Sequence, residues 1–281
     1  GMTKLGGIVR VERRFARSAR IDSDLNGTPP LAGYVLQPSV RKALETMVQA
    51  IAESRQAAFT WTGPYGGGKS CAALLVANLV GGQAEQRKVA KEIVGPELVA
   101  AFAEAFPGKG KWPVVALTGR RASLREELAT AAGSVLDWSK TELASASRDE
   151  KALCEILRAD SETHGGLLII IDELGKFFEH AALDGGDIHI LQDLAELAAR
   201  SDGKLVIAGI LHQSFAQYAG RLTRAARDEW AKIQGRFLDI PFAAGPDEVA
   251  ALLARAIDCD ATPADARERA SVVAKAIGER R

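Results

Sequence analysis

The sequence predicts an α/β protein with a parallel, doubly wound sheet of about five strands and helices on both faces. Apolar strand candidates alternate with helical segments along most of the 281 residues, which is typical of strands joined by crossover helices. Residues 167–171 are all aliphatic, as expected for a central parallel strand that is covered on both faces. A glycine-rich turn leads from one apolar run directly into a strong helical pattern.

The expected elements follow from periodicity and from chain breakers. Strands are predicted at residues 57–61, 114–117, 167–171, 205–210 and 237–241. Helices are predicted at residues 40–54, 69–80, 84–106 with a break at Pro96, 123–132, 148–160, 188–200 and 214–234. Ser39 is the expected N-cap of the first helix, and Gly81 and Gly82 are expected to end the second.

The chain divides into an irregular N-terminal arm, a core and a short C-terminal segment. The arm covers residues 1–33, the core covers residues 34–242, and residues 243–281 are expected to form a partial, truncated helical lid. Helical insertions are expected in the core near residues 83–111 and 133–165. The arm carries a basic cluster, read either as a solvated face or as a contact for phosphate or a partner: Arg10, Arg13, Arg14, Arg17 and Arg20.

Composition excludes several classes of protein. The chain has 36 Lys and Arg against 36 Asp and Glu, so its surface as a whole does not suit a coat on nucleic acid or anionic lipid. With 47% hydrophobic and 26% charged residues, it resembles ordinary globular proteins rather than disordered ones. Its longest aliphatic run, residues 167–171, is far shorter than the roughly 20 residues that span a bilayer. We therefore expect no membrane contact.

The cysteines and histidines favour a cytoplasmic protein without a zinc motif. The three cysteines (Cys71, Cys154 and Cys259) are widely spaced and form no Cys-x-x-Cys pair, which fits a reducing compartment. The four histidines show no metal-ligand spacing.

Residues 63–70 match the phosphate-binding pattern G-x-x-x-x-G-K-[ST]. A loop that wraps a polyphosphate must turn successive N–H groups inward, which requires glycine, and the helix that follows adds its positive N-terminal end. Lys69 is expected to reach the β- and γ-phosphates, and the Ser70 hydroxyl is expected to coordinate Mg²⁺. The predicted nucleotide-binding residues are Gly63, Pro64, Tyr65, Gly66, Gly67, Gly68, Lys69, Ser70 and Cys71.

An acidic pair, Asp172 and Glu173, ends the aliphatic strand at 167–171 and matches a Walker B pattern. Asp172 is expected to hold the hydration shell of Mg²⁺, and Glu173 is expected to act as the general base on the attacking water. A glutamate directly after this aspartate is typical of ATP-hydrolysing machines rather than of small-molecule kinases.

The stretch Gln234-Gly235-Arg236-Phe237-Leu238-Asp239 completes a resemblance to the AAA+ superfamily over about residues 34–242. The resemblance implies that Arg236 reaches the ATP of a neighbouring subunit, where a planar permanent charge would stabilise the transition state. Leu238 departs from the usual pattern, because the acidic residue comes one place late, so a structural arginine is the alternative. Lesser candidates are Arg221, Arg224 and Arg227.

The same resemblance implies two further features. The strand between the two motif strands would end in a sensor of the γ-phosphate, with His212 and Gln213 as candidates and an ordinary polar strand end as the alternative. Residues 34–38 would either stack on adenine or pack in the core. Residues 172–178 and 228–237 also resemble large bacterial ATP-binding proteins linked to defence against foreign DNA, which would make this chain the ATPase module of a longer protein.

We therefore expect an ATPase that binds ATP and Mg²⁺ and couples hydrolysis to conformational change or assembly. A homo-oligomer and a protein or DNA partner are expected with it. The alternative is a nucleotide-gated switch or scaffold with slow hydrolysis, whose output is the binding of a partner. Phosphoryl transfer to a small molecule is a weaker alternative, because no acceptor motif is visible.

Overall fold

The computed structural model describes residues 10–11, 31, 34–64, 68–184, 188–212, 220, 223–243 and 257–258. Five strands form one all-parallel sheet in the order β3-β4-β5-β2-β6. Their bounds are β2 Ala58–Thr62, β3 Val114–Thr118, β4 Leu167–Asp172, β5 Leu205–Leu211 and β6 Leu238–Pro241. Numbered among themselves, these strands run 2-3-4-1-5 across the sheet, an order consistent with a P-loop-like α/β core. The predicted fold class is confirmed.

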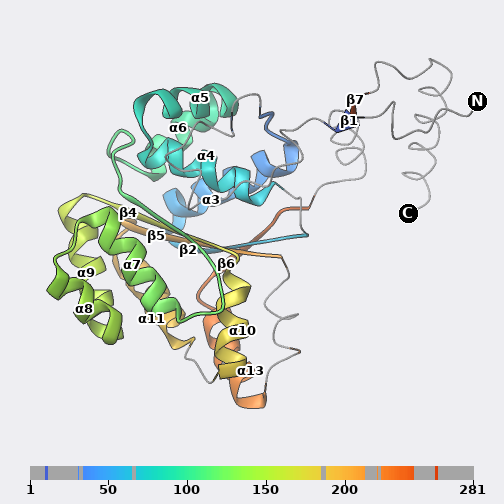
Figure 1. Ribbon diagram of the computed structural model, residues 1–281. Helices are drawn as coiled ribbons and strands as arrows, with labels where there is room; N and C mark the ends of the chain where they lie inside the picture. Colours follow the sequence, from blue (N-terminus) through green and yellow to red (C-terminus); the bar gives the residue numbers. More distant parts are fainter. Residues whose placement is uncertain are drawn as a thin grey trace, which may run out of the picture.

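Helices cover both faces of this sheet (Figure 1). One layer holds α3 Pro38–Ser54, α4 Lys69–Gly81, α5 Ala84–Val94 and α6 Pro96–Ala105. The other layer holds α7 Leu124–Leu136, α8 Lys140–Arg148, α9 Glu150–Thr163, α10 Leu174–Asp184, α11 His189–Arg200 and α13 Arg224–Gln234. Because each face has its own layer, the central strands are shielded from water on both sides.

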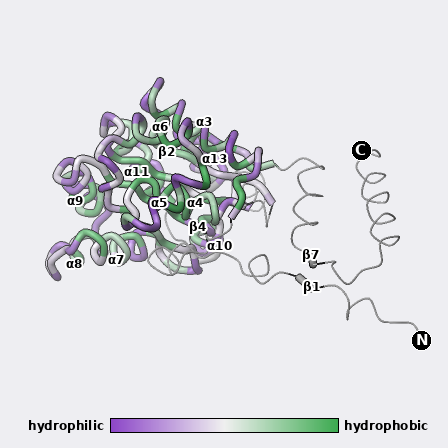
Figure 2. Tube along the Cα trace, turned by 90° about the horizontal axis from the view of Figure 1, so that it is seen from above, coloured by the Kyte–Doolittle hydropathy of each residue, from purple (hydrophilic) through white to green (hydrophobic). Residues whose placement is uncertain are grey.

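The burial of the strands follows from their place in the sheet. Every residue of β2, β4 and β5 is buried, whereas the edge strand β6 has three exposed residues out of four. The aliphatic run in β4 therefore has the double coverage that its composition requires. Figure 2 shows hydrophobic residues concentrated in the middle of the body and hydrophilic residues on outer helices such as α8.

The helix after the glycine-rich turn, α4, lies at the centre of its layer. All its residues from Ala72 to Val80 are buried, and it contacts α3, α5, α6, β3 and β4. A helix that is apolar all round needs cover on every side. The predicted insertion near 83–111 supplies that cover as α5 and α6, which fixes the start of α4 relative to the sheet.

Most predicted elements agree with the structure to within two or three residues at each end, with some exceptions. The N-cap of α3 is Gln37 with Pro38 in the first turn, so the prediction of Ser39 as the cap is wrong. Helices α8 and α10 were not predicted as separate elements, although α8 falls in the expected insertion at 133–165. Of the predicted lid at 243–281, the structure describes residue 243 and β7 Ile257–Asp258, which pairs antiparallel with β1 Arg10–Val11.

In the part of the chain that the structure describes, no helix has the length and apolar character needed to cross a membrane.

Candidate functional site

The carboxyl ends of the strands meet at one edge of the sheet, because all five strands run parallel. The last residue of β2, Thr62, pairs with Leu211 of β5, and Thr118 of β3 pairs with Asp172 of β4. The segments that leave this edge begin at Gly63, Gly119, Glu173 and His212. Two sequence motifs that lie far apart in the chain are therefore brought side by side, as ligand sites at the ends of parallel strands require.

Gly63 and Gly68, at the two ends of the glycine-rich turn, have backbone angles that favour glycine. Gly68 has a φ of 79° and Gly63 a φ of 150°, which L-residues with side chains rarely adopt. A Cβ on Gly63 would also lie 2.6 Å from the carbonyl oxygen of Phe242. Gly68 is the N-cap of α4, so the turn ends at the positive N-terminus of that helix. Tyr65, Gly66 and Gly67 lie outside the described residues.

Lys69 carries a buried positive charge, and the glycine-rich turn supplies its hydrogen-bond acceptors. Only 4% of the residue is exposed, and its Nζ donates to the carbonyl oxygens of Gly63 and Pro64, each at 2.7 Å. Burial lowers the pKa of Lys69, while the nearby charges of Asp172 and Glu173 oppose that shift. The ammonium group is thus held between the turn and the acidic pair.

Ser70 and Asp172 are in direct contact. Ser70 Oγ donates to Asp172 Oδ2 at 2.9 Å, although the two residues are 102 positions apart. Burial raises the pKa of Asp172, and the hydrogen bonds from Ser70 and from the backbone N–H of Glu173 oppose this rise. A hydroxyl beside a carboxylate is an all-oxygen pair of the kind that Mg²⁺ takes from proteins, so the donor set fits that ion.

Glu173 has a constrained backbone. Its φ is 52°, in the left-handed region that residues other than glycine rarely occupy. Its N–H donates to Asp172 Oδ1 at 2.8 Å, and its carbonyl accepts from the N–H of Lys176 at 3.0 Å. A Cβ on Gly119 would lie 2.0 Å from that carbonyl oxygen, so only glycine fits there. Strain of this kind clusters at functional sites and is held by the surrounding contacts.

The Glu173 side chain is engaged by two basic groups. His212 Nε2 lies 2.9 Å from Glu173 Oε1, and Lys176 Nζ lies 3.7 Å from Oε2. His212 follows β5, which does lie between the two motif strands, so the expected placement of its strand is confirmed. Gln213, the other sensor candidate, lies outside the described residues. The structure thus places His212 against Glu173, a contact that the sequence did not indicate.

Asp239, the acidic residue of the segment 234–239, binds two threonines of the neighbouring strand. It accepts hydrogen bonds from Thr60 Oγ1 at 2.9 Å and from Thr62 Oγ1 at 3.0 and 3.1 Å. Both threonines belong to β2, and the N–H of Phe242 donates to the Thr62 carbonyl at 2.7 Å. With Asp239 directed at β2, β6 secures the strand end from which the glycine-rich turn departs.

Arg236 lies at the opposite edge of the sheet from the acidic pair. It precedes β6, and its carbonyl oxygen lies 3.5 Å from Nε2 of Gln56, which precedes β2. Its guanidinium Nη1 is 2.7 Å from Glu196 Oε1 on α11, with 39% of the side chain exposed. A five-residue strand is about 16 Å long, so Arg236 does not reach the glycine-rich turn of its own chain.

The remaining predicted residues take peripheral places. Cys71 is half-buried on α4. Tyr34 and Leu36 pack against the core while Val35 is 51% exposed, which agrees with the alternative that residues 34–38 pack in the core. Arg224 and Arg227 are exposed on α13, and Arg221 lies outside the described residues.

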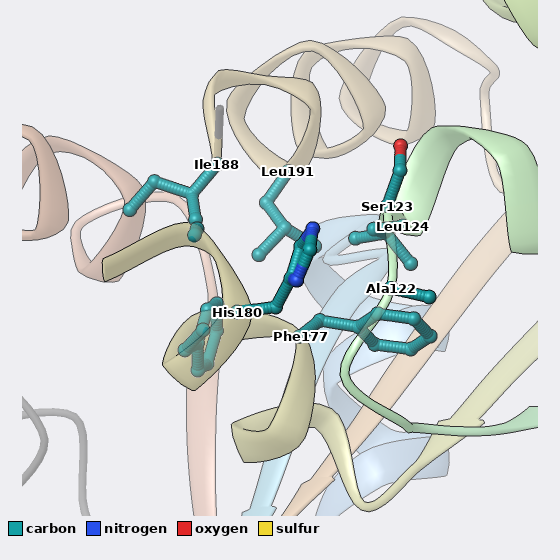
Figure 3. A pocket seen from close by; sticks show the side chains of 9 residues that line it. Ala122, Ser123, Leu124, Phe177, His180, Ile188 and Leu191 are labelled. Atoms are coloured by element: carbon teal, nitrogen blue, oxygen red, sulfur yellow. The ribbon is translucent and has the colours of Figure 1, made fainter. Parts of the chain in front are cut away.

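A small cavity lies between α7, α10 and α11. Figure 3 shows His180 of α10 directed toward Leu124 and Leu191 in this cavity. Its volume of about 40 Å³ holds a few water molecules and is far too small for a nucleotide.

The sequence missed three residues that shape the site: Gly119, Lys176 and Asp239. The sequence holds a signal for the first two of these residues. Gly119 follows the strand predicted at residues 114–117, and Lys176 lies three residues after Glu173, a spacing that brings two side chains together on a helix. The role of Asp239 depends on which strand is its neighbour, and the sequence does not give this.

No protein-family model matches the chain, and a comparison with curated proteins returned no match. The fold and the geometry of the site are therefore the observations from which a function can be argued.

The buried charge of Asp172 yields a prediction about stability. Burial raises the pKa of Asp172, so its carboxyl group holds a proton more tightly in the folded protein than in the unfolded chain. At pH values above the ordinary carboxyl pKa, the ionised side chain therefore lowers the free energy of unfolding. Asp172→Asn should raise the free energy of unfolding at pH 7 by about 1 kcal/mol, since an amide can still pair with Ser70 and the Glu173 N–H. Urea unfolding would measure it.

The gain from Asp172→Asn should shrink as the pH is lowered toward 4, where the native carboxyl group takes up its proton. Asp202→Asn is the matched control, because that side chain is 82% exposed and should change stability little. A loss of stability at pH 7 in the Asp172 variant alone would contradict this account of the site.

Proposed function

We propose that the chain is a Mg²⁺-dependent ATPase whose site lies at the carboxyl edge of the sheet, between the glycine-rich turn and the acidic pair. The contact between Ser70 and Asp172 carries the proposal. Each was singled out, from a different motif, as a ligand of one Mg²⁺ ion, and the fold brings them within hydrogen-bond distance. The strand order agrees with this placement.

The proposed role of Lys69 follows from its surroundings. Its ammonium group is buried and bonded to the two carbonyl oxygens that open the turn. Phosphate oxygens would be stronger acceptors than neutral carbonyls, so a polyphosphate laid along the turn would draw the ammonium onto itself. The α4 N-terminus would add its partial positive charge at the same point.

Glu173 is the proposed general base. It lies beside the predicted Mg²⁺ ligand Asp172 and has its carboxylate directed toward His212. The ion, when bound, would supply charge neutralisation for the phosphates, and Glu173 would take the proton of the attacking water. His212 would hold the carboxylate in position, and it is the proposed sensor of the γ-phosphate.

Arg236 is the proposed finger that acts on a neighbouring subunit. Arg236 lies at the far edge of the sheet, too distant to act on the nucleotide site of its own chain. Its side chain is partly exposed and is therefore accessible to a second chain. Such an arrangement couples hydrolysis to assembly, because the reaction would need two chains in contact. The weaker likeness to defence-linked bacterial proteins would make this core the ATPase module of a larger protein.

A nucleotide-gated switch with slow hydrolysis is the second candidate, and one observation favours it. Glu173 is paired with His212 and Lys176, and Arg236 is paired with Glu196, so both residues of the chemical step are engaged within the chain. A partner protein or DNA would then set the rate by releasing them. Turnover measured with and without DNA, together with the oligomeric state, separates the two candidates.

Lys69→Ala should abolish ATP binding. The change removes the charge that faces the phosphates, and the dissociation constant should rise by about 100-fold or more. Isothermal titration calorimetry with Mg²⁺ and a non-hydrolysable ATP analogue would measure it. Lys232→Ala, which changes an exposed lysine on α13, is the control and should bind normally. An unchanged affinity in the Lys69 variant would remove the phosphate-loop interpretation.

Glu173→Gln should bind ATP normally and lose turnover by about 100- to 10,000-fold, because an amide cannot accept the proton of water. Phosphate release and analogue affinity should be measured on the same preparation. Glu179→Gln on α10, where the carboxylate is 43% exposed, is the matched control and should keep its activity. Hydrolysis at the wild-type rate in the Glu173 variant would show that the base has been wrongly assigned.

If Arg236 acts between subunits, activity per chain should rise with protein concentration, and Arg236→Ala should lower it by about 1000-fold. A mixture of the Arg236→Ala and Glu173→Gln proteins should recover activity, because one chain supplies the intact site and the other supplies the arginine. Arg200→Ala, which changes an exposed arginine at the end of α11, is the control and should keep its activity. A concentration-independent rate in a demonstrated monomer, or no recovery on mixing, would contradict the finger.

A further inference from the structure

Two helices on the face opposite α4 bring a histidine and two carboxylates together. Glu150 is the first residue of α9, His189 is the first residue of α11, and Asp193 lies one turn further along α11. The ligand atoms of these three side chains all lie within 4.8 Å of one another. His189 Nδ1 is 3.3 Å from Glu150 Oε1 and 3.5 Å from Asp193 Oδ2.

These distances are long for hydrogen bonds and also match those between ligands of a shared ion. A single Nδ1–H can point at only one oxygen, and both separations exceed the usual range for N–H···O bonds, about 2.7–3.2 Å. Two ligands on one tetrahedral cation, each about 2.0–2.2 Å from it, lie about 3.3–3.5 Å apart. The nitrogen therefore lies at ligand spacing from each of the two oxygens, and all three atoms lie within 4.8 Å of one another.

The sequence pattern supports the same reading. His189 and Asp193 are four residues apart on one helix, which places both side chains on one face. Glu150 enters from a second helix that contacts α11, so the group is held by two packed elements rather than by a loop. Asp193 also lines an open hollow of about 480 Å³ between α9 and α11, which gives an ion a path from solvent.

We propose that Glu150, His189 and Asp193 form a binding site for a divalent transition-metal ion of the Zn²⁺ class. An imidazole with two carboxylates suits Zn²⁺ or Co²⁺, whereas Mg²⁺ and Ca²⁺ take all-oxygen sites. Water would fill the fourth position, since the three side chains are 21–43% exposed. The ion would fasten α9, from the insertion at 133–165, to α11.

This site is independent of the proposed nucleotide site. Ser70 and Asp172 belong to α4 and β4 and offer oxygen ligands alone. The metal ion would join two helices that contribute no residue to that oxygen pair. The two proposals therefore fail separately: loss of ATP binding says nothing about zinc, and the reverse also holds.

The test is equilibrium dialysis of the EDTA-treated full chain against ZnCl₂, with bound zinc measured by mass spectrometry. Wild-type protein should bind one equivalent, and its melting temperature should rise with zinc. His189→Ala and Asp193→Asn should each weaken binding by at least about tenfold and remove the thermal shift. Circular dichroism and melting without zinc show that the variants fold. His164→Ala, at the far end of α9, is the matched control and should bind as the wild type does.

Three outcomes would overturn the proposal. The first is no zinc bound by the wild-type chain above the His189→Ala background. The second is binding that survives His189→Ala and Asp193→Asn but disappears in Cys154→Ser, which would assign the ion to the half-buried thiol one turn along α9. The third is displacement of zinc by excess Mg²⁺, which would indicate an all-oxygen site.

Discussion

The hydrogen bond from Ser70 to Asp172 is the contact on which the candidate site depends, because it joins the two halves of the site across the sheet. β2 and β4 are not neighbours in the sheet, since β5 lies between them. Ser70 reaches Asp172 because α4 starts after the glycine-rich turn and lies over β4. The burial of α4, and so the cover from α5 and α6, sets where that serine is held.

The electrostatics of the site oppose stability. Burial lowers the pKa of Lys69 and raises that of Asp172, so each charged form costs free energy in the folded protein. Glu173 adds a left-handed backbone, and Gly119 leaves no room for a side chain beside it. If these groups served folding alone, apolar side chains could replace them with little loss of stability. Their accumulation at one edge of the sheet is what a phosphate and metal site would require.

The sequence predicts the sheet well because its strands are strongly marked. The aliphatic run in β4 and the glycine-rich turn after β2 are compatible with few structures other than a buried parallel strand and a phosphate-binding turn. The position of β5 between β4 and β2 was expected from the resemblance to the AAA+ superfamily. Contacts between side chains of different elements were not predictable. The pairing of His212 with Glu173 and the bond from Thr62 to Asp239 depend on strand order and register, which local patterns do not encode. The cluster of Glu150, His189 and Asp193 was not predictable for the same reason, because its side chains come from two helices.

A crystal structure of the chain with Mg²⁺ and a non-hydrolysable ATP analogue tests the central claim most directly. Lys69 Nζ should leave the carbonyls of Gly63 and Pro64 for the phosphates, and Ser70 Oγ should turn from Asp172 to the ion, with Asp172 bound through water. Glu173 should face the γ-phosphate. An analogue bound elsewhere, with the contacts of Lys69 and Ser70 unchanged at saturating concentration, would contradict the account.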